Sequence, residues 1–124
     1  MPLPLPIALI DRTEGLTPAL DRPRPDRLEA GNPQRWTWLL HEAGPMSAGV
    51  WACEVGRWRI AFPPHKQEYF FVLEGHVRLH GAGGSVVDVQ AGQGAVIPPS
   101  FEGAFEVVRP VRKHFVVVDA QPVP

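Results

Sequence analysis

Short apolar runs separated by glycine- and proline-containing turns fill the chain from Trp36 onward. Typical runs are "RWTWLLHE", "AGVWACEV", "RWRIAF", "EYFFVLEGHVRLH" and "VRKHFVVVDA", and turn-forming stretches such as "AGPMS" and "GAGG" separate them. No segment shows a sustained helical period with capping residues. Many short strands at this spacing are typical of an all-β sandwich or barrel. We therefore expect residues 36–124 to form one β-domain.

The first 35 residues have a different composition, with prolines in "PLPLP", "DRPRPDR" and "GNPQR". Proline fixes the backbone φ angle and removes a hydrogen-bond donor, so this segment is expected to be an extended arm. Its beginning contains the apolar residues Leu3, Leu5, Ile7, Leu9 and Ile10. They make the segment too apolar for a disordered tail, so we expect residues 1–35 to pack on the barrel or on a partner subunit.

Composition and charge exclude several classes of protein. The chain has 124 residues and a formal net charge of -1, which gives no electrostatic reason to expect nucleic acid or an anionic membrane as a partner. A single cysteine, Cys53, excludes a disulfide framework and a CxxC zinc site, and its strand-like context predicts a buried thiol. The sequence shows no signal-peptide pattern and no apolar stretch of membrane-spanning length, so the expected location is the cytoplasm.

One carboxylate stands at the start of a strongly apolar run, "EYFFVLEG". In a strand, Glu68 would share a face with Phe70 and Val72, while Tyr69 and Leu73 would lie on the other face. Both faces are apolar, so the strand is expected to be buried on both sides. A carboxylate in that position costs several kcal/mol unless it is paired, bound to a metal or protonated.

Residues 49–119 resemble the cupin superfamily, most closely its small single-domain branch, which is related to the ureidoglycine aminohydrolase cupin domain. The matching stretches are "GVWACEVGRWRIAF", "EYFFVLEGHVRL", "AGQGAVIPPSFEGAFEV" and "PVRKHFVV". The resemblance implies an antiparallel double-sheet jelly-roll β-barrel with a pocket at one mouth, and it makes a homodimer the expected assembly.

The metal-binding motifs of the superfamily are incomplete in this chain. Glu68 and Gly75 fit the Glu-x6-Gly part of the first motif, but its two histidine positions hold Phe62 and Pro64, or Ala61 and Pro63 in the alternative spacing. In the second motif Gly92 and Pro98 fit, whereas Ser100 replaces a glycine and Gly103 replaces the histidine. A divalent metal needs three or four converging N or O donors, so no metal cofactor is expected. If a metal were present, His65 and Glu68 would be its ligands.

Glu68 and Lys113 are the candidate catalytic residues. Desolvation in an apolar pocket would raise the pKa of Glu68 and suit it to proton transfer, although a purely structural carboxylate is the alternative. Lys113 alternates with Phe115 and Val117, and the resemblance places it near the pocket, where it would orient a ligand or only neutralise Glu68. The expected pocket walls are Trp58, Phe62, Phe70, Phe101 and Phe105.

Three functions stay open at this point. The first is a cupin that binds, or binds and acts on, a small polar metabolite without a metal. The second is a divalent-metal enzyme of the aminohydrolase or dioxygenase kind with replaced ligands, and the third is a non-catalytic sensor or structural domain. The sequence leaves open whether the protein is an enzyme at all, because this fold serves many chemistries.

Overall fold

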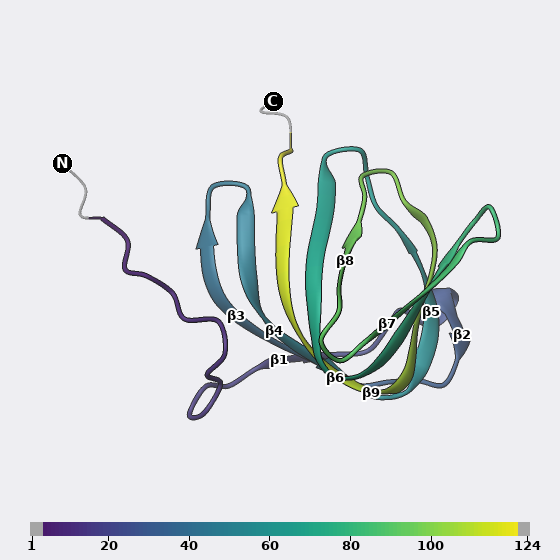
Figure 1. The fold of residues 1–124 in the computed structure, drawn as a ribbon, viewed down its shortest axis with the longest axis horizontal. Coiled ribbons are helices and arrows are strands. Elements are labelled where there is room, and N and C mark those ends of the chain that lie inside the picture. Colours follow the sequence, from purple (N-terminus) through teal and green to yellow (C-terminus); the bar gives the residue numbers. More distant parts are fainter. Residues whose placement is uncertain (1–3, 122–124) are drawn as a thin grey trace.

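The computed structural model describes residues 4–121, and their regular secondary structure consists of strands apart from one short 3-10 turn (Figure 1). The elements are β1 (Ala19–Asp21), the 3-10 turn η1 (Pro25–Arg27), β2 (Leu28–Ala30), β3 (Arg35–Ala43), β4 (Met46–Cys53), β5 (Gly56–Ala61), β6 (Lys66–Gly81), β7 (Val86–Gln90), β8 (Gly94–Ile97) and β9 (Glu102–Asp119). Within residues 4–121, none of the helical structure has the length and apolar character that a membrane crossing requires.

Two long bent strands, β6 and β9, hold the architecture together. The second half of β9 pairs with β4 and with the first half of β6, and the sheet continues through β3 and β1 on one side and β8 on the other. The first half of β9 pairs with β5 and with the end of β6, which extends this second layer to β2 and β7. All pairs are antiparallel, and Figure 1 shows the strands curling around a common interior. The predicted antiparallel β-barrel is confirmed.

The bend between the two layers requires a glycine. Gly75 lies in β6 where the pairing with β9 changes register, and its φ is 95°. A Cβ atom at this position would lie 2.2 Å from the carbonyl oxygen of Pro110 in β9. Only a residue without a side chain allows the two backbones to approach this closely. The glycine of the Glu-x6-Gly motif therefore has a structural cause in this chain.

The core lies between the two layers and follows the predicted strand alternation. Its buried members come mainly from β6 and β9 and are Cys53, Trp58, Phe70, Val72, Val77, Leu79, Val89, Ile97, Phe105, Val107, Val111 and Phe115. The expectation that β6 would be buried on both faces is wrong. Tyr69 and Leu73 on its outer face are 43% and 38% exposed, because no described element covers this side of the sheet.

Part of the first 35 residues joins the sheets. β1 pairs with β3, β2 pairs with β5, and the Arg112 guanidinium donates a hydrogen bond of 2.8 Å to the Thr13 hydroxyl. The stretch before β1 leads away from the barrel in Figure 1, and the Ile7 side chain is 99% exposed. Leu3 lies outside the described residues, as do residues 122–124. The division into an arm (1–35) and a barrel (36–124), with the arm packing on the barrel or on a partner subunit, stays a prediction.

Candidate functional site

A cavity of about 290 Å³ opens inside the curled sheets. Seven of the nine strands contribute to its wall, which consists of Asp21, Arg35, Thr37, Trp51, Trp58, Ile60, Phe62, Lys66, Glu68, Ile97, Phe105, Lys113, Phe115 and Val117. Strand alternation explains this lining, because these side chains point to the inner face of their strands. Pockets for small molecules are typically about 300–1,000 Å³, so this one has the size for a small ligand.

Glu68 and Lys113 form an ion pair in the wall of this cavity. The Nζ atom of Lys113 donates a hydrogen bond of 2.8 Å to Oε2 of Glu68, and the side chains are 5% and 14% exposed respectively. Lys113 faces Val72 and Glu68 faces Val117 across the β6–β9 ladder, so both side chains project from one face of neighbouring strands. This pairing satisfies the buried carboxylate whose position in an apolar strand required an explanation.

Aromatic rings surround the Lys113 ammonium. Its Nζ atom lies 4.5 Å from the ring centroid of Trp51, 4.3 Å from that of Phe70 and 4.9 Å from that of Phe105. Each ring face attracts a cation by roughly 0.5–2 kcal/mol, and more where water is excluded. The rings and the Glu68 carboxylate together compensate the desolvation of the ammonium, and removing the carboxylate would leave the charge with ring faces alone.

A second ion pair borders the same cavity. Arg35 in β3 donates two hydrogen bonds to the Asp21 carboxylate in β1, with Nε–Oδ1 at 2.8 Å and Nη2–Oδ2 at 2.6 Å. The guanidinium carbon of Arg35 also lies 5.3 Å from the Trp58 ring centroid. Asp21 faces Arg35 directly in the β1–β3 ladder, so this forked geometry is fixed by strand register. Sequence reasoning missed both residues, since only the pairing of β1 with β3 brings them to the cavity.

Most of the predicted wall residues lie at this cavity. Trp58, Phe62 and Phe105 line it, and Phe70 lies fully buried against the Lys113 ammonium. Phe101 is not part of the lining; it is partly buried and packs against the core cluster. Trp51, Ile60, Thr37 and Lys66 were not among the predicted wall residues, although Trp51 and Ile60 lie in predicted strands with the required phase.

The histidines do not converge on Glu68. The Nδ1 atom of His65 lies 2.6 Å from Oδ1 of Asp119, and His65 is not part of the cavity wall. His114 faces away from Lys113, as its alternation predicts; its Nε2 atom is buried and lacks a hydrogen-bond partner among residues 4–121. Within that range, no three His, Cys, Asp or Glu side chains are grouped closely enough to hold a metal ion.

The residues at the cavity do not fit a divalent metal. The imidazole positions of the cupin motif are held by side chains such as Phe62, which lines the cavity, and the Glu68 and Asp21 carboxylates are engaged by Lys113 and Arg35. A metal would have to displace both cations and would still lack nitrogen donors. The expectation of a metal-free protein stays a prediction.

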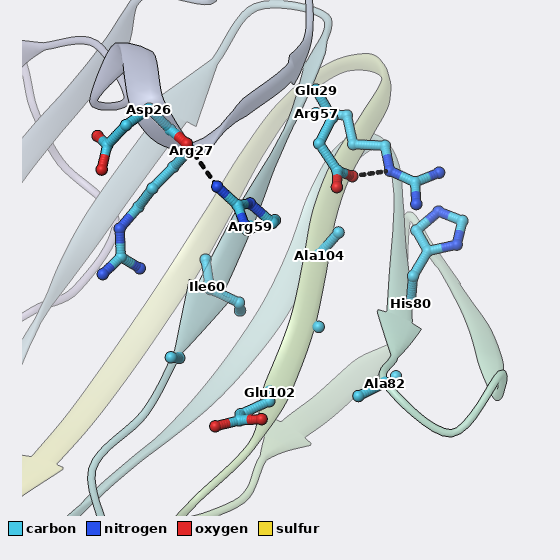
Figure 2. A pocket seen from close by; sticks show the side chains of 13 residues that line it. Asp26, Arg27, Glu29, Arg57, Arg59, Ile60, His80, Ala82, Glu102 and Ala104 are labelled. Atoms are coloured by element: carbon cyan, nitrogen blue, oxygen red, sulfur yellow. Dashed lines mark hydrogen bonds and ion pairs between the residues drawn. The ribbon is translucent and has the colours of Figure 1, made fainter.

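A second hollow, of about 540 Å³, lies on the outer side of β5 and β9 (Figure 2). Figure 2 shows Arg59 donating a hydrogen bond to the Asp26 carbonyl oxygen and Arg57 pairing with Glu29, at 2.7 Å between Nε and Oε1. The charged side chains there are partly or fully exposed, and the floor includes small residues such as Ala104. This outer hollow has no buried functional group, so the inner cavity is the better candidate site.

Known proteins support the same architecture. A family model described as EutQ-like cupin domain matches residues 40–115. A Pseudomonas syringae protein of unknown function from the DUF861 family is 27% identical, with a TM-score of 0.76 over 88% of this chain and 46% of that one. This chain therefore spans less than half the length of that relative. No curated protein matches the chain.

Two solved structures carry the EutQ name. The Clostridium difficile EutQ protein is 20% identical and has a TM-score of 0.64, over 78% of this chain and 79% of its own. A putative ethanolamine utilization protein from Salmonella typhimurium is 17% identical, with a TM-score of 0.62 over 85% of this chain and 98% of its own. At these identities the likeness shows the fold. The family match, which covers more than half of the sequence, shows that the chain belongs to the cupin superfamily, as a small EutQ-like cupin domain.

Proposed function

We propose that the inner cavity binds a small polar metabolite and that Glu68 and Lys113 orient it without a metal. The observation that supports this most strongly is a buried ion pair that forms part of the wall of a cavity. A purely structural ion pair needs no open space beside it, and protein cores are normally packed without voids of this size. Aromatic side chains alone do not fill the space, which counts against a solid, non-binding core.

The pair offers a ligand both kinds of hydrogen-bonding group. Lys113 has three donors and uses one for Glu68, while the bond occupies one of the two carboxylate oxygens of Glu68. A ligand hydroxyl or amide therefore finds an acceptor and a donor side by side in a largely water-excluded wall. If the ligand is a substrate, Glu68 is the group placed to accept its proton and Lys113 the group placed to stabilise negative charge.

A metabolite screen by thermal shift tests this proposal, with wild type, Glu68→Gln and Glu102→Gln compared at equal ligand concentrations. Glu102 lines the outer hollow, so its variant is the matched control. A true ligand stabilises wild type by about 2.7 kcal/mol at a hundredfold excess over Kd. We expect this stabilisation to survive Glu102→Gln and to disappear in Glu68→Gln. Binding that is equal in all three proteins, or no stabilising compound at all, would remove the support for the cavity as a binding site.

The divalent-metal enzyme is the competing function. Metal analysis of protein purified without an affinity tag separates the two, because a ligand held by Glu68 and Lys113 needs no ion. One zinc, iron, manganese or nickel ion per chain would favour the metal enzyme. The relation to ureidoglycine aminohydrolases and a cytoplasmic location stay predictions of the sequence.

We also propose that the protein forms a homodimer through the outer face of β3, β4, β9, β6 and β8. This face presents the aromatic side chains of Trp36, Trp38, Tyr69 and Phe71, and next to them the exposed side chain of Val96. Isolated apolar side chains are normal on a protein surface, whereas a contiguous group of this kind marks an interaction site. The Nε2 atom of His114, which is buried and has no hydrogen-bond partner within residues 4–121, lies on the same face.

The apolar arm supports a second copy of the chain as the partner of this face. Leu5, Ile7 and Leu9 are all exposed, and the hydrogen bond between Thr13 and Arg112 anchors the base of the arm to the same outer face. Residues 4–12, when extended, span about 30 Å, which is enough to cross a neighbouring subunit. Light scattering at several concentrations is expected to give twice the chain mass for wild type. The monomer mass is expected for Ile7→Glu/Leu9→Glu, and the dimer mass for the control variant Val86→Glu, at an exposed position on the outer side of β7. A monomeric wild type would refute this assembly.

A further inference from the structure

The charges of the inner cavity do not balance, and the excess is positive. Its wall contains three cationic side chains, Arg35, Lys66 and Lys113, and two carboxylates, Asp21 and Glu68. The chain has only two lysines, and both lie at this cavity. Each carboxylate is already engaged at hydrogen-bond distance by its own cation, Asp21 by Arg35 and Glu68 by Lys113. Lys66 is the remaining cation.

Lys66 lies at the rim of the cavity and points along the same strand face as Glu68. Its Nζ atom lies 4.7 Å from the ring centroid of Phe62, and the side chain is half-buried. Among residues 4–121, no carboxylate lies within ion-pair distance of Lys66. An ammonium at the mouth of a partly desolvated cavity attracts anions more strongly than one in open water, because the local dielectric constant is lower.

The rest of the wall is aromatic and aliphatic. Trp58, Ile60 and Phe62 extend inward from the rim toward the buried ion pair, and the Trp58 and Phe105 rings stack at 5.3 Å. Such a surface suits the apolar body of a ligand. An aromatic wall also attracts cations, but here Lys113 and Arg35 already lie over the Trp51, Phe105 and Trp58 rings. A cationic ligand would meet three positive side chains and few free ring faces.

We infer that the ligand of this cavity is a small monoanionic carboxylate with an apolar group. The inference rests on the proposed function and specifies its ligand class. The ligand carboxylate pairs with Lys66 at the rim, and the apolar group contacts Trp58 and Phe62. One negative charge matches the single excess cation, and about 290 Å³ accommodates a compound the size of phenylacetate.

Three probes of nearly equal shape test the inference: phenylacetate, phenylacetamide and phenethylamine. Binding is followed by the NMR signals of the indole N–H groups of Trp51 and Trp58, two residues that line the cavity. We expect phenylacetate to bind about tenfold more tightly than phenylacetamide, and phenethylamine to bind most weakly. The preference for the acid is expected to shrink as salt rises, since a rim ion pair is screened.

Substitutions at Lys66 separate a ligand contact from a structural role. Lys66→Gln is expected to lower the affinity for phenylacetate about tenfold and to leave the affinity for phenylacetamide unchanged. Lys66→Arg is expected to keep the wild-type affinity for phenylacetate. Arg57→Gln, which removes a cation from the outer hollow, is expected to change neither. An amide or amine that binds as well as the acid, or an acid preference that survives Lys66→Gln, overturns the inference but leaves the binding site intact. If no compound of any charge moves the cavity tryptophan signals, the proposed function itself fails.

Discussion

Breaking the Glu68–Lys113 pair from one side has a large and calculable cost. In Glu68→Gln the Lys113 side chain, only 5% of which is in water, loses its carboxylate partner and faces a neutral amide. Removing one partner of a buried ion pair typically destabilises a protein by about 3–5 kcal/mol. A domain of this size has about 5–15 kcal/mol of total stability, so the variant is expected to lose a large fraction of it. Lys113→Met leaves the Glu68 carboxylate without its cation and is expected to cost a similar amount.

The double variant Glu68→Gln/Lys113→Met distinguishes an uncompensated charge from lost packing. It removes both charges, so its cost is expected to fall below the sum of the single variants by about 2 kcal/mol or more. Urea unfolding at pH 7 measures all four free energies of unfolding, and unchanged m-values show that the compared states are equivalent. Asp26→Asn is the control, because it breaks an exposed pair with Arg24 that is worth at most about 1 kcal/mol. Single variants that each lose less than about 1 kcal/mol and add without coupling would refute the reasoning.

Burial raises the pKa of the Cys53 thiol to about 12, so the folded protein is expected to leave DTNB unreacted at pH 8 and to react only when unfolded; prompt reaction of folded protein would contradict this. The hydrogen bond from His76 holds the pKa of the Asp88 carboxyl below its usual range. The Asp88 carboxyl therefore binds a proton less readily in the folded state than in the unfolded state. Its lowered pKa stabilises the folded state at pH values above the ordinary aspartate pKa, and this stabilisation is lost as pH falls through the lowered pKa. Asp88→Asn is expected to flatten that acid dependence in urea titrations, and an unchanged profile would count against it. Gly75→Ala is expected to lower the free energy of unfolding by about 3 kcal/mol or more, because the new Cβ atom would collide with backbone atoms at a positive φ. Gly83→Ala is the control and is expected to be near neutral, because a Cβ atom there meets open space. Equal effects of the two substitutions would be inconsistent with the bend at Gly75.

Strand alternation in the sequence predicted the orientation of several side chains of the site. Once "EYFFVLEG" and "VRKHFVVV" are placed as neighbouring inner strands, period-two patterning orients Glu68 and Lys113 inward, and the structure joins them at 2.8 Å. The absence of the motif imidazoles could be read from the sequence, because Phe62 occupies one of their positions. The structure then places Phe62 in the cavity wall. Local pattern succeeds here because orientation along a strand depends only on neighbouring residues.

Long-range pairing explains what the sequence did not reveal. Asp21 lies in a stretch without strong strand character, and only the β1–β3 ladder brings its carboxylate beside Arg35 at the cavity. The outer face of β6 was expected to be covered because its residues are apolar, yet Tyr69 and Leu73 are exposed. The apolar residues of this face show that its burial is favourable, but they do not identify the element that covers it. We propose that a second copy of the chain covers this face.

The four tryptophans provide the most direct measurement of whether the inner cavity binds ligands. Trp51 and Trp58 line the cavity, whereas Trp36 and Trp38 belong to the opposite side of the sheet. In ¹⁵N-labelled protein titrated with phenylacetate, we predict saturable shifts of the Trp51 and Trp58 indole signals, no shift of Trp36 and Trp38, and an affinity about tenfold lower in Lys66→Gln. Shifts confined to Trp36 and Trp38, or none for any compound of the metabolite screen, would contradict a binding site built on the buried ion pair.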